Sequence, residues 1–447
     1  MKTQITKLGL WALFALALAV AAVSCEDEPY KYKVADGKPV IYMIRPAGNA
    51  QDTLITSSYM EQSLCIVGDN LRSVVEMYFN DVPAVLNNSY MTDHTILVDV
   101  PGTIPGEVSN TIYFINSQKD TVKYDFQVLV PGPSLLSMSN EYQPAGEEAV
   151  LVGDYFIDDP NVPLTVTFSG NKEAEIKSFT KNSITVVVPD GAEEGPVTIS
   201  TVYGTVSSVF HYMDNRGILF DFDTDPRRKA HGWHNDHMDL ITDETSLSGN
   251  YLRIGNGSVT MSEAGGWDDS NFSFEYWPGD WTDPVSYNDS PLLTDYADFS
   301  DWENMSMKFE LNIPASNPWS AGAMQIIPAG LDKISGSGAG VDIYGNTCAG
   351  ANNTFFKLEK EGGLNVPRAL YQPWAAQADG MFHTDGKWIT VTIPFSTFIY
   401  GFDGTESSLS LSEKEFTSLT IFVVGGPEGV ECNPIIKLDN IRAVPNK

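Results

Sequence analysis

The stretch "LCIVGDNL" (64–71) returns further along the chain as "AVLVGDYF" (149–156), and the segments that follow each copy also correspond. "VEMYFND" (75–81) matches "LTVTFSG" (164–170), and "HTILVDVP" (94–101) matches "NSITVVVP" (182–189). Apolar and polar residues alternate in these runs, and Gly, Pro, Asn and Asp separate them, which is typical of short β-strands. The region therefore predicts two copies of one all-β unit.

The repeated order of strand, "VGD", strand and "VxVP" resembles that of IPT/TIG immunoglobulin-like domains. This resemblance implies two β-sandwiches, at 38–131 and 132–215, of a size that this architecture favours. The stretch "VPGP" (130–133) predicts a short, stiff joint between them.

The composition changes after residue 217. Apart from Trp11, all tryptophans fall between Trp233 and Trp388, and the two repeats contain none. Strand-like runs such as "MSMKFELNIP" (305–314) and "KWITVTIPF" (387–395) alternate with long Gly- and Asn-rich segments. We expect one large jelly-roll-type β-sandwich at 217–447, so the predicted fold class is all-β throughout.

The N-terminal residues predict export and lipidation. Lys2 and Lys7 precede the apolar run 8–23, which is typical of a secretory signal at 1–24. The following "AAVSC" resembles a bacterial lipobox, which implies a lipid on Cys25 as the only contact with a membrane. The acidic tether at 25–37 begins with "EDEPY" after Cys25 and resembles the surface-export signal of Bacteroidota lipoproteins. An ordinary signal peptide and a plain solvated linker are the alternatives.

Charge and cysteine usage exclude several classes of function. The formal net charge of −31 disfavours nucleic acid and anionic membrane surfaces as partners, because the field of the protein repels both. Cys65, Cys348 and Cys432 are widely scattered, without the spacing of a disulfide framework or a zinc site.

Aromatic residues in turn-forming segments of the last domain are the candidate ligand contacts. Flat Trp and Tyr rings offer large contact area at little entropy cost, and they stack on the C–H faces of sugars. The predicted rings, expected to be exposed, are Tyr276, Trp277, Trp281, Trp319, Tyr371 and Trp374, and the predicted polar contacts are Glu275, Asp280, Asp283 and Gln325. For each ring the alternative is loop anchoring. Trp388, within a strand-like run, is expected to pack in the core.

No catalytic residues are predicted. A glycoside hydrolase needs two carboxylates across the scissile bond, but with 58 acidic residues the presence of a pair carries no information. Asp221, Asp223 and Asp439 could supply oxygen ligands to a structural Ca²⁺ where the first and last strands of the domain meet. The favoured alternative is a row of exposed acids, and no other cofactor is expected.

Across its whole length the chain resembles the surface glycan-binding proteins of the B type of Bacteroidota polysaccharide-utilisation loci, which are lipoproteins in the SusE/SusF position. "NPWSAGAMQIIP" (317–328), "RALYQPW" (368–374) and "KWITVTIPF" (387–395) are its most specific parts. The resemblance implies a lipid-anchored protein on the surface of the outer membrane. It also implies non-catalytic binding of a neutral plant β-glucan or hemicellulose, xyloglucan or mixed-linkage β-glucan, beside a SusC/SusD-type importer and surface glycanases. A surface endo-glycanase with a jelly-roll catalytic domain and a protein-binding adhesin are the alternatives.

Overall fold

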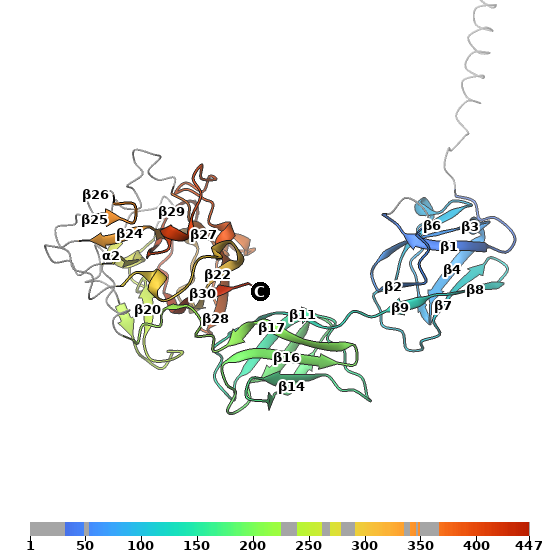
Figure 1. Cartoon of the computed structure of the whole chain (residues 1–447), viewed down its shortest axis with the longest axis horizontal. Helices are drawn as coiled ribbons and strands as arrows, with labels where there is room; N and C mark the ends of the chain where they lie inside the picture. Colours follow the sequence, from blue (N-terminus) through green and yellow to red (C-terminus); the bar gives the residue numbers. More distant parts are fainter. Residues whose placement is uncertain are drawn as a thin grey trace, which may run out of the picture. The chain divides into compact units, whose positions relative to one another are not determined.

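The computed structural model describes residues 32–48, 53–224, 239–261, 269–278, 291–334, 340–345, 347–348 and 366–446. The chain forms two compact units, Met1–Pro131 and Gly132–Lys447. Strands dominate both units, and the α-helix α2 (Asp269–Phe272) is a single turn, so the predicted all-β class is confirmed (Figure 1). Within the described ranges, no helix has both the length and the apolar character needed to cross a membrane.

The first unit is a sandwich of two antiparallel sheets. One sheet has the order β1 (Val40–Pro46), β3 (Ser63–Asp69) and β6 (Thr95–Asp99). The other has the order β5 (Val82–Pro83), β4 (Val74–Phe79), β7 (Thr111–Asn116) and β8 (Thr121–Asp125). A short parallel pair, β2 (Ser57–Tyr59) and β9 (Gln127–Leu129), joins them. Alternate residues of the facing strands, such as Ile66, Ile96 and Phe114, form one apolar core.

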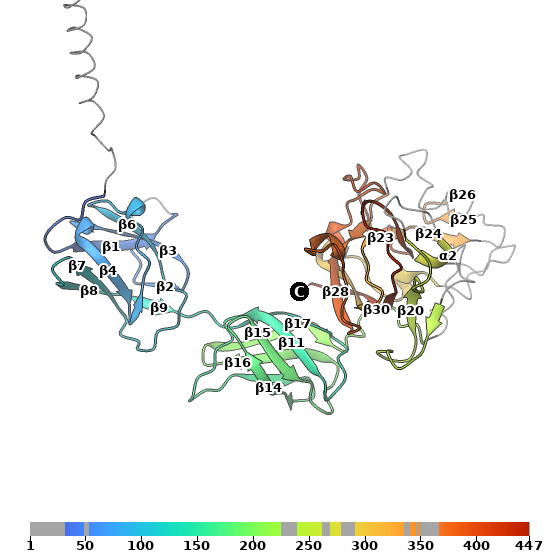
Figure 2. The ribbon, with the colours of Figure 1, turned by 180° about the vertical axis from the view of Figure 1, so that it is seen from behind.

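The second unit begins with a sandwich of the same plan. One sheet has the order β10 (Ser134–Met138), β11 (Glu148–Asp154), β15 (Ser183–Val187) and β14 (Glu175–Phe179). The other has the order β13 (Lys172–Glu173), β12 (Thr165–Phe168), β16 (Gly195–Thr201) and β17 (Gly204–Tyr212). Both sheets are visible in Figure 2, and their inward residues form a second core.

The glycine of each "VGD" copy has a steric reason. A Cβ at Gly68 would lie 2.0 Å from the carbonyl oxygen of Val40, and a Cβ at Gly153 would lie 2.0 Å from that of Ser134. In both sandwiches the first strand shifts register by a bulge just after this contact, which brings the two backbones together. Only glycine tolerates such a close backbone approach. The repeated "VGD" therefore marks the same bulged strand pair twice.

The rest of the second unit is the larger sandwich. Its first sheet has the order β19 (Asp239–Ile241), β20 (Tyr251–Ile254), β30 (Ile436–Pro445), β22 (Met305–Asn312) and β28 (Ile389–Pro394), with β18 (Ile218–Phe220) also on β30. Its second sheet has the order β21 (Ser273–Tyr276), β29 (Ser418–Gly429), β23 (Ala321–Ala329) and β27 (Ala369–Tyr371). A small sheet follows β23: β24 (Leu331–Ile334), β25 (Gly340–Asp342) and β26 (Thr347–Cys348). The main core lies between the first two sheets.

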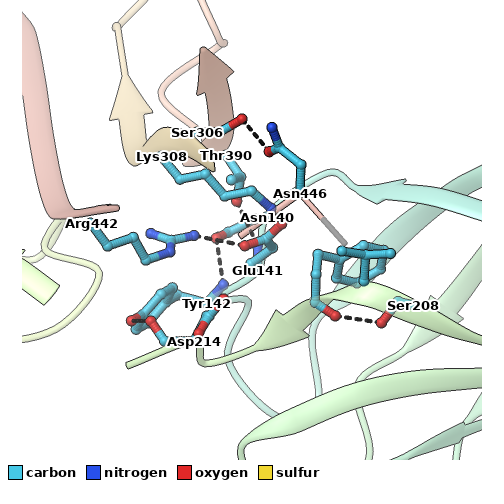
Figure 3. A network of polar contacts seen from close by, with 12 residues as sticks. Asn140, Glu141, Tyr142, Ser208, Asp214, Ser306, Lys308, Thr390, Arg442 and Asn446 are labelled. Carbon is cyan, nitrogen blue, oxygen red and sulfur yellow. Dashed lines mark hydrogen bonds and ion pairs between the residues drawn. The ribbon is translucent and has the colours of Figure 1, made fainter. Parts of the chain in front are cut away.

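A buried ionic network connects the two sandwiches of the second unit (Figure 3). Glu141, from the loop after β10, accepts hydrogen bonds from Lys308 of β22 and, at 2.7 Å, from Arg442 of β30. Arg442 also donates to both carboxylate oxygens of Glu310, at 2.8 and 3.0 Å. Thr390 of β28 donates to Glu310 at 3.0 Å and accepts from the backbone N–H of Glu141 at 2.7 Å. These contacts attach the loop to the outer face of the larger sandwich.

The charges of this network depend on one another. Burial raises the pKa of Glu310, and the Arg442 guanidinium opposes this effect. For Arg442, burial alone would lower the pKa, but Glu310 and Glu141 outweigh it, so the pKa of Arg442 is raised. Arg442 is therefore a buried cation whose charge is compensated by the two carboxylates that face it.

Candidate functional site

Trp319 and Trp374 belong to the core, so the prediction that their rings are exposed is wrong. Trp319 has no exposed surface, and its Nε1 donates to the carbonyl oxygens of Ala321 at 2.7 Å and Gly322 at 3.1 Å. The buried Trp374 donates to the same Gly322 oxygen at 3.1 Å. A bulge between Ala321 and Ala323 interrupts the ladder here, and Gly322 adopts a φ of +73°. The bulge carbonyl gives both indoles a hydrogen-bond acceptor, which allows them to be buried.

Tyr371 also faces inward rather than toward solvent. It is half-buried against the main core, and its ring centroid lies 6.0 Å from that of Trp319. Burial raises the pKa of the Tyr371 phenol to about 12. Trp319, Tyr371 and Trp374 thus meet at one end of the sandwich as a packing cluster.

Tyr276 and Trp277 occupy opposite faces of the second sheet at the end of β21, and both are buried, which corrects their predicted exposure as well. Tyr276 packs in the main core, and its hydroxyl donates to the carbonyl oxygen of Pro291 at 2.6 Å. Trp277 is 1% exposed, and its Nε1 donates to the Thr420 hydroxyl of β29 at 3.1 Å. Neither ring has a free face for a ligand.

These two residues instead fix both ends of the segment 279–290. Trp277 attaches the incoming chain to β29, and Tyr276 holds Pro291 on the outgoing side. Leu293 then donates its backbone N–H to the Thr417 carbonyl oxygen at 3.0 Å, next to the start of β29. Trp281, Asp280 and Asp283 belong to the segment itself and lie outside the described residues, as do Trp233 and Trp267.

Glu275 and Gln325, two of the predicted polar contacts, lie on the outer face of the second sheet. Both are buried. This differs from the solvent-accessible positions that a ligand contact requires. The Gln325 side-chain oxygen accepts a hydrogen bond from Arg368 Nη1 at 2.8 Å. Burial lowers the pKa of Arg368 to about 10. With Thr420, these side chains form a buried polar layer next to Trp277, in place of the apolar packing on the core side of the same sheet.

Arg368 was not among the residues singled out from the sequence. It lies in "RALYQPW" (368–374), where the aromatic residues are the predicted ligand contacts. The signal for its placement is its position two residues before Leu370, because residues two apart in a strand lie on the same face of the sheet. Nothing in the local sequence distinguishes a buried arginine there from an exposed one.

The three aspartates proposed as calcium ligands do not assemble into a ligand set. Asp221 accepts hydrogen bonds from the backbone N–H groups of Asp223 and Thr224, and Asp223 accepts two from Asn250. In the part of the chain that is described, three metal-ligating groups converge within 4.8 Å only at Glu194, His211 and Asp214. There, Arg216 already donates to both oxygens of Asp214 at 2.8 Å, so we assign no metal to it.

Asp439 is fully buried and is held in its protonated form. Its Oδ1 accepts the Asn440 backbone N–H at 2.8 Å, and its Oδ2 has no hydrogen-bond partner among the described residues. Burial, reinforced by Glu310, Asp223 and Asp221, raises the pKa of Asp439 to about 9. A neutral carboxyl group is the species that this position favours.

Asp439→Asn is therefore expected to change how stability depends on pH. Between about pH 4 and pH 9 the folded state binds a proton that the unfolded state releases, so this group makes the free energy of unfolding fall as pH rises. The asparagine variant should lose this slope and gain stability relative to the parent at pH 8. Urea unfolding at pH 5, 6, 7 and 8 measures it, with the exposed Asp190→Asn as control. If the free energy of unfolding depends on pH in the same way for Asp439→Asn and the parent, the raised pKa assigned to Asp439 is contradicted.

Trp388 lies on the face opposite the one expected. Ile389 and Ile393 pack against the main core, whereas Trp388, one residue before β28, is half-buried on the outer face. Its ring meets that of Tyr251 edge-on at 5.7 Å, and its Nε1 donates to the Thr245 carbonyl oxygen at 2.8 Å. Trp388 thus holds the turn around Thr245 on the sheet.

Comparisons with known proteins agree with this architecture. Residues 212–445 match the family described as "Surface glycan-binding protein B xyloglucan binding domain". The chain is similar to the solved surface glycan-binding protein PbSGBP-B from Prevotella bryantii, at 45% identity and a TM-score of 0.75. That match covers 92% of this chain and 100% of the other. An IPT/TIG domain-containing protein of Bacteroides ovatus is 25% identical over 227 residues, which span 47% of this chain and 45% of that relative.

These matches settle the family. The family match covers more than half of the chain, and the Prevotella bryantii relative aligns along its whole length. The predicted IPT/TIG-like repeats agree with the relative from Bacteroides ovatus, which is named for that domain. The family is defined by binding rather than turnover, so the prediction that the protein is not an enzyme is confirmed by family membership. The chain belongs to the surface glycan-binding proteins of the B type.

Proposed function

We propose that this protein holds a neutral plant β-glucan or hemicellulose at the cell surface without cleaving it. Xyloglucan is the first candidate, and mixed-linkage β-glucan the second. The observation that carries the proposal is the match of residues 212–445 to a family described by xyloglucan binding. The strongly acidic chain also suits an uncharged ligand, since it would repel a polyanionic glycan.

The contacts are proposed to come from segment 279–290, with Trp281 as the stacking ring and Asp280 and Asp283 as hydrogen-bond acceptors for sugar hydroxyls. Two features of the described residues support this choice. The rings of Trp277, Trp319 and Trp374 are buried, and each indole N–H is bonded to a backbone or hydroxyl acceptor. The residues on either side of the segment, Trp277 and Pro291, are held on the sandwich by hydrogen bonds.

The protein is further proposed to act from the outer leaflet, with Cys25 carrying the lipid and residues 25–37 serving as an acidic tether. Residues 1–31 lie outside the described part, so this proposal rests on the sequence. A SusC/SusD-type importer and surface glycanases are proposed as partners by family resemblance. A weak single site suits this role, because many copies on one polymer bind by avidity.

Affinity electrophoresis of the mature chain tests the function. Gels containing xyloglucan, mixed-linkage β-glucan, mannan or a pectin are compared, and released reducing ends are assayed in parallel. We expect retardation by xyloglucan or mixed-linkage β-glucan, none by the acidic pectin, and no released ends. Unchanged mobility in both β-glucan gels would contradict the proposed ligand class, and steady release of oligosaccharides would contradict non-catalytic binding.

A further inference from the structure

A groove of about 750 Å³ in the first sandwich borders β6. Its lining includes Pro83, Val85 and Tyr90 from the chain before β6, and Leu97, Asp99 and Pro101 from β6 and the residues after it. Val85 is 88% exposed and Tyr90 is 58% exposed, unusually high values for apolar side chains on a folded domain. β6 is the edge strand of its sheet, a place where backbone groups are available for pairing.

The second sandwich covers the corresponding edge with a strand of its own. There, β15 is paired on its outer side by β14, in a register that includes Glu175 with Val187 and Ile176 with Val186 (Figure 2). In the first sandwich, β6 is the last strand of a sheet with the order β1-β3-β6 (Figure 1). Across the described residues, the outer side of β6 is met by the 3₁₀ turn Asn88–Tyr90, by one isolated bridge between Met91 and Ile96, and by the hydrogen bond from Thr92 to Thr95.

Two extra residues account for this difference between the repeats. Ala84 donates its N–H to Met77 at 2.9 Å, as Ala174 does to Val166, and Thr92 donates to Thr95 at 2.8 Å, as Thr180 does to Ser183. The span from Ala84 to Thr92 is therefore equivalent to Ala174–Thr180, but it is two residues longer. The longer segment forms a 3₁₀ turn at Asn88–Tyr90 in place of a strand like β14. The sheet therefore lacks a fourth strand along the edge of β6 beyond Ile96.

We propose that β6 accepts an extended segment of a partner protein, which takes the place that β14 fills in the second sandwich. Strand addition at a sheet edge supplies backbone hydrogen bonds, and the groove walls supply contacts for alternate side chains. The lining includes the carboxylates of Glu61 and Asp99 but no Lys, Arg or His. The partner segment therefore carries Lys or Arg beside aliphatic residues. The protein's own acidic tether and a second copy of this acidic chain have the wrong charge for the groove.

Hydrogen exchange of the mature chain tests this proposal with a synthetic probe, acetyl-Lys-Val-Thr-Val-Lys-Val-amide. We expect the probe to slow exchange of the backbone amides of residues 95–100 by roughly tenfold at saturation. A probe with Pro at two alternate positions lacks the required N–H groups and should have no effect. A probe with Glu in place of Lys should protect the same amides much less.

Two variants make the test specific. Deleting Asn88 and Ser89 restores the spacing of the second repeat, so it should close the edge, protect the amides of residues 95–100 without the probe and abolish the response to the probe. If circular dichroism shows that the deletion variant does not fold, Asp99→Lys is used as the test instead. This substitution should weaken binding of the Lys probe and strengthen binding of the Glu probe. Absence of protection by the Lys probe would overturn the proposal. Equal protection by a xyloglucan oligosaccharide would also overturn it and assign the groove to sugar.

Discussion

Arg442→Ala is expected to lower the free energy of unfolding by about 3–5 kcal/mol, the cost of leaving a buried charge without its partner. Arg442 and Glu310 have no exposed side-chain surface, and Glu310 would lose both of its guanidinium hydrogen bonds. Glu141 would keep Lys308 but lose Arg442. Urea unfolding followed by tryptophan fluorescence measures the change, since all tryptophans after the signal lie in the last domain.

Two further variants separate charge from packing. Lys387→Ala removes an exposed cation from the same domain and should cost less than about 1 kcal/mol. Arg442→Lys keeps a charge but not the fork that reaches both Glu310 oxygens, so its cost should be intermediate. An Arg442→Ala cost as small as that of Lys387→Ala would contradict the role of the network in stability.

Trp319→Ala is expected to destabilise the last domain by about 3–5 kcal/mol, the usual cost of truncating a buried Trp. The indole fills the end of the core, and its Nε1 satisfies the Ala321 and Gly322 carbonyl oxygens at the bulge. The same substitution in an exposed binding platform would leave stability nearly unchanged. Thermal unfolding of the parent and the variant distinguishes these two roles directly.

Trp319→Phe is the matched control for this prediction. It keeps most of the buried area but removes the N–H, so we expect a loss of about 1–2 kcal/mol for an acceptor left without its donor. Glycan affinity of the folded Trp319→Phe variant should equal that of the parent. Normal stability of Trp319→Ala together with lost binding would show that Trp319 is a ligand contact.

The repeat architecture could be predicted because it rests on backbone constraints that the sequence displays. Gly68 and Gly153 are required by carbonyl oxygens 2.0 Å from where a Cβ would stand, and the alternation around them marks each sheet face. The two-residue insertion before Thr92 was also present in the sequence. Its effect on β6 depends on pairing between distant segments, which local patterns do not encode.

The exposure of individual rings could not be predicted in the same way. Pro, Asn and Ser beside Trp319 indicate a turn, and turns are usually at the surface. The bulge at Gly322 reverses that expectation, because its carbonyl allows two indoles to be buried with their hydrogen bonds satisfied. The prediction that Trp388 packs in the core is wrong for a simpler reason. Trp388 lies one residue out of phase with the core-facing isoleucines of its strand.

We propose that Trp281 contacts the glycan and that Trp319 serves the core, and calorimetric titration with a xyloglucan heptasaccharide separates these two roles. Trp281→Ala is compared with Trp319→Phe, both first shown to be folded. We predict that Trp281→Ala weakens binding by roughly 30-fold, equivalent to about 2 kcal/mol for an anchoring aromatic, with an unchanged Tm. Trp319→Phe should bind as the parent does, with a lower Tm. Full affinity of Trp281→Ala together with loss of binding in Trp319→Phe would assign the ligand contact to Trp319 instead of Trp281.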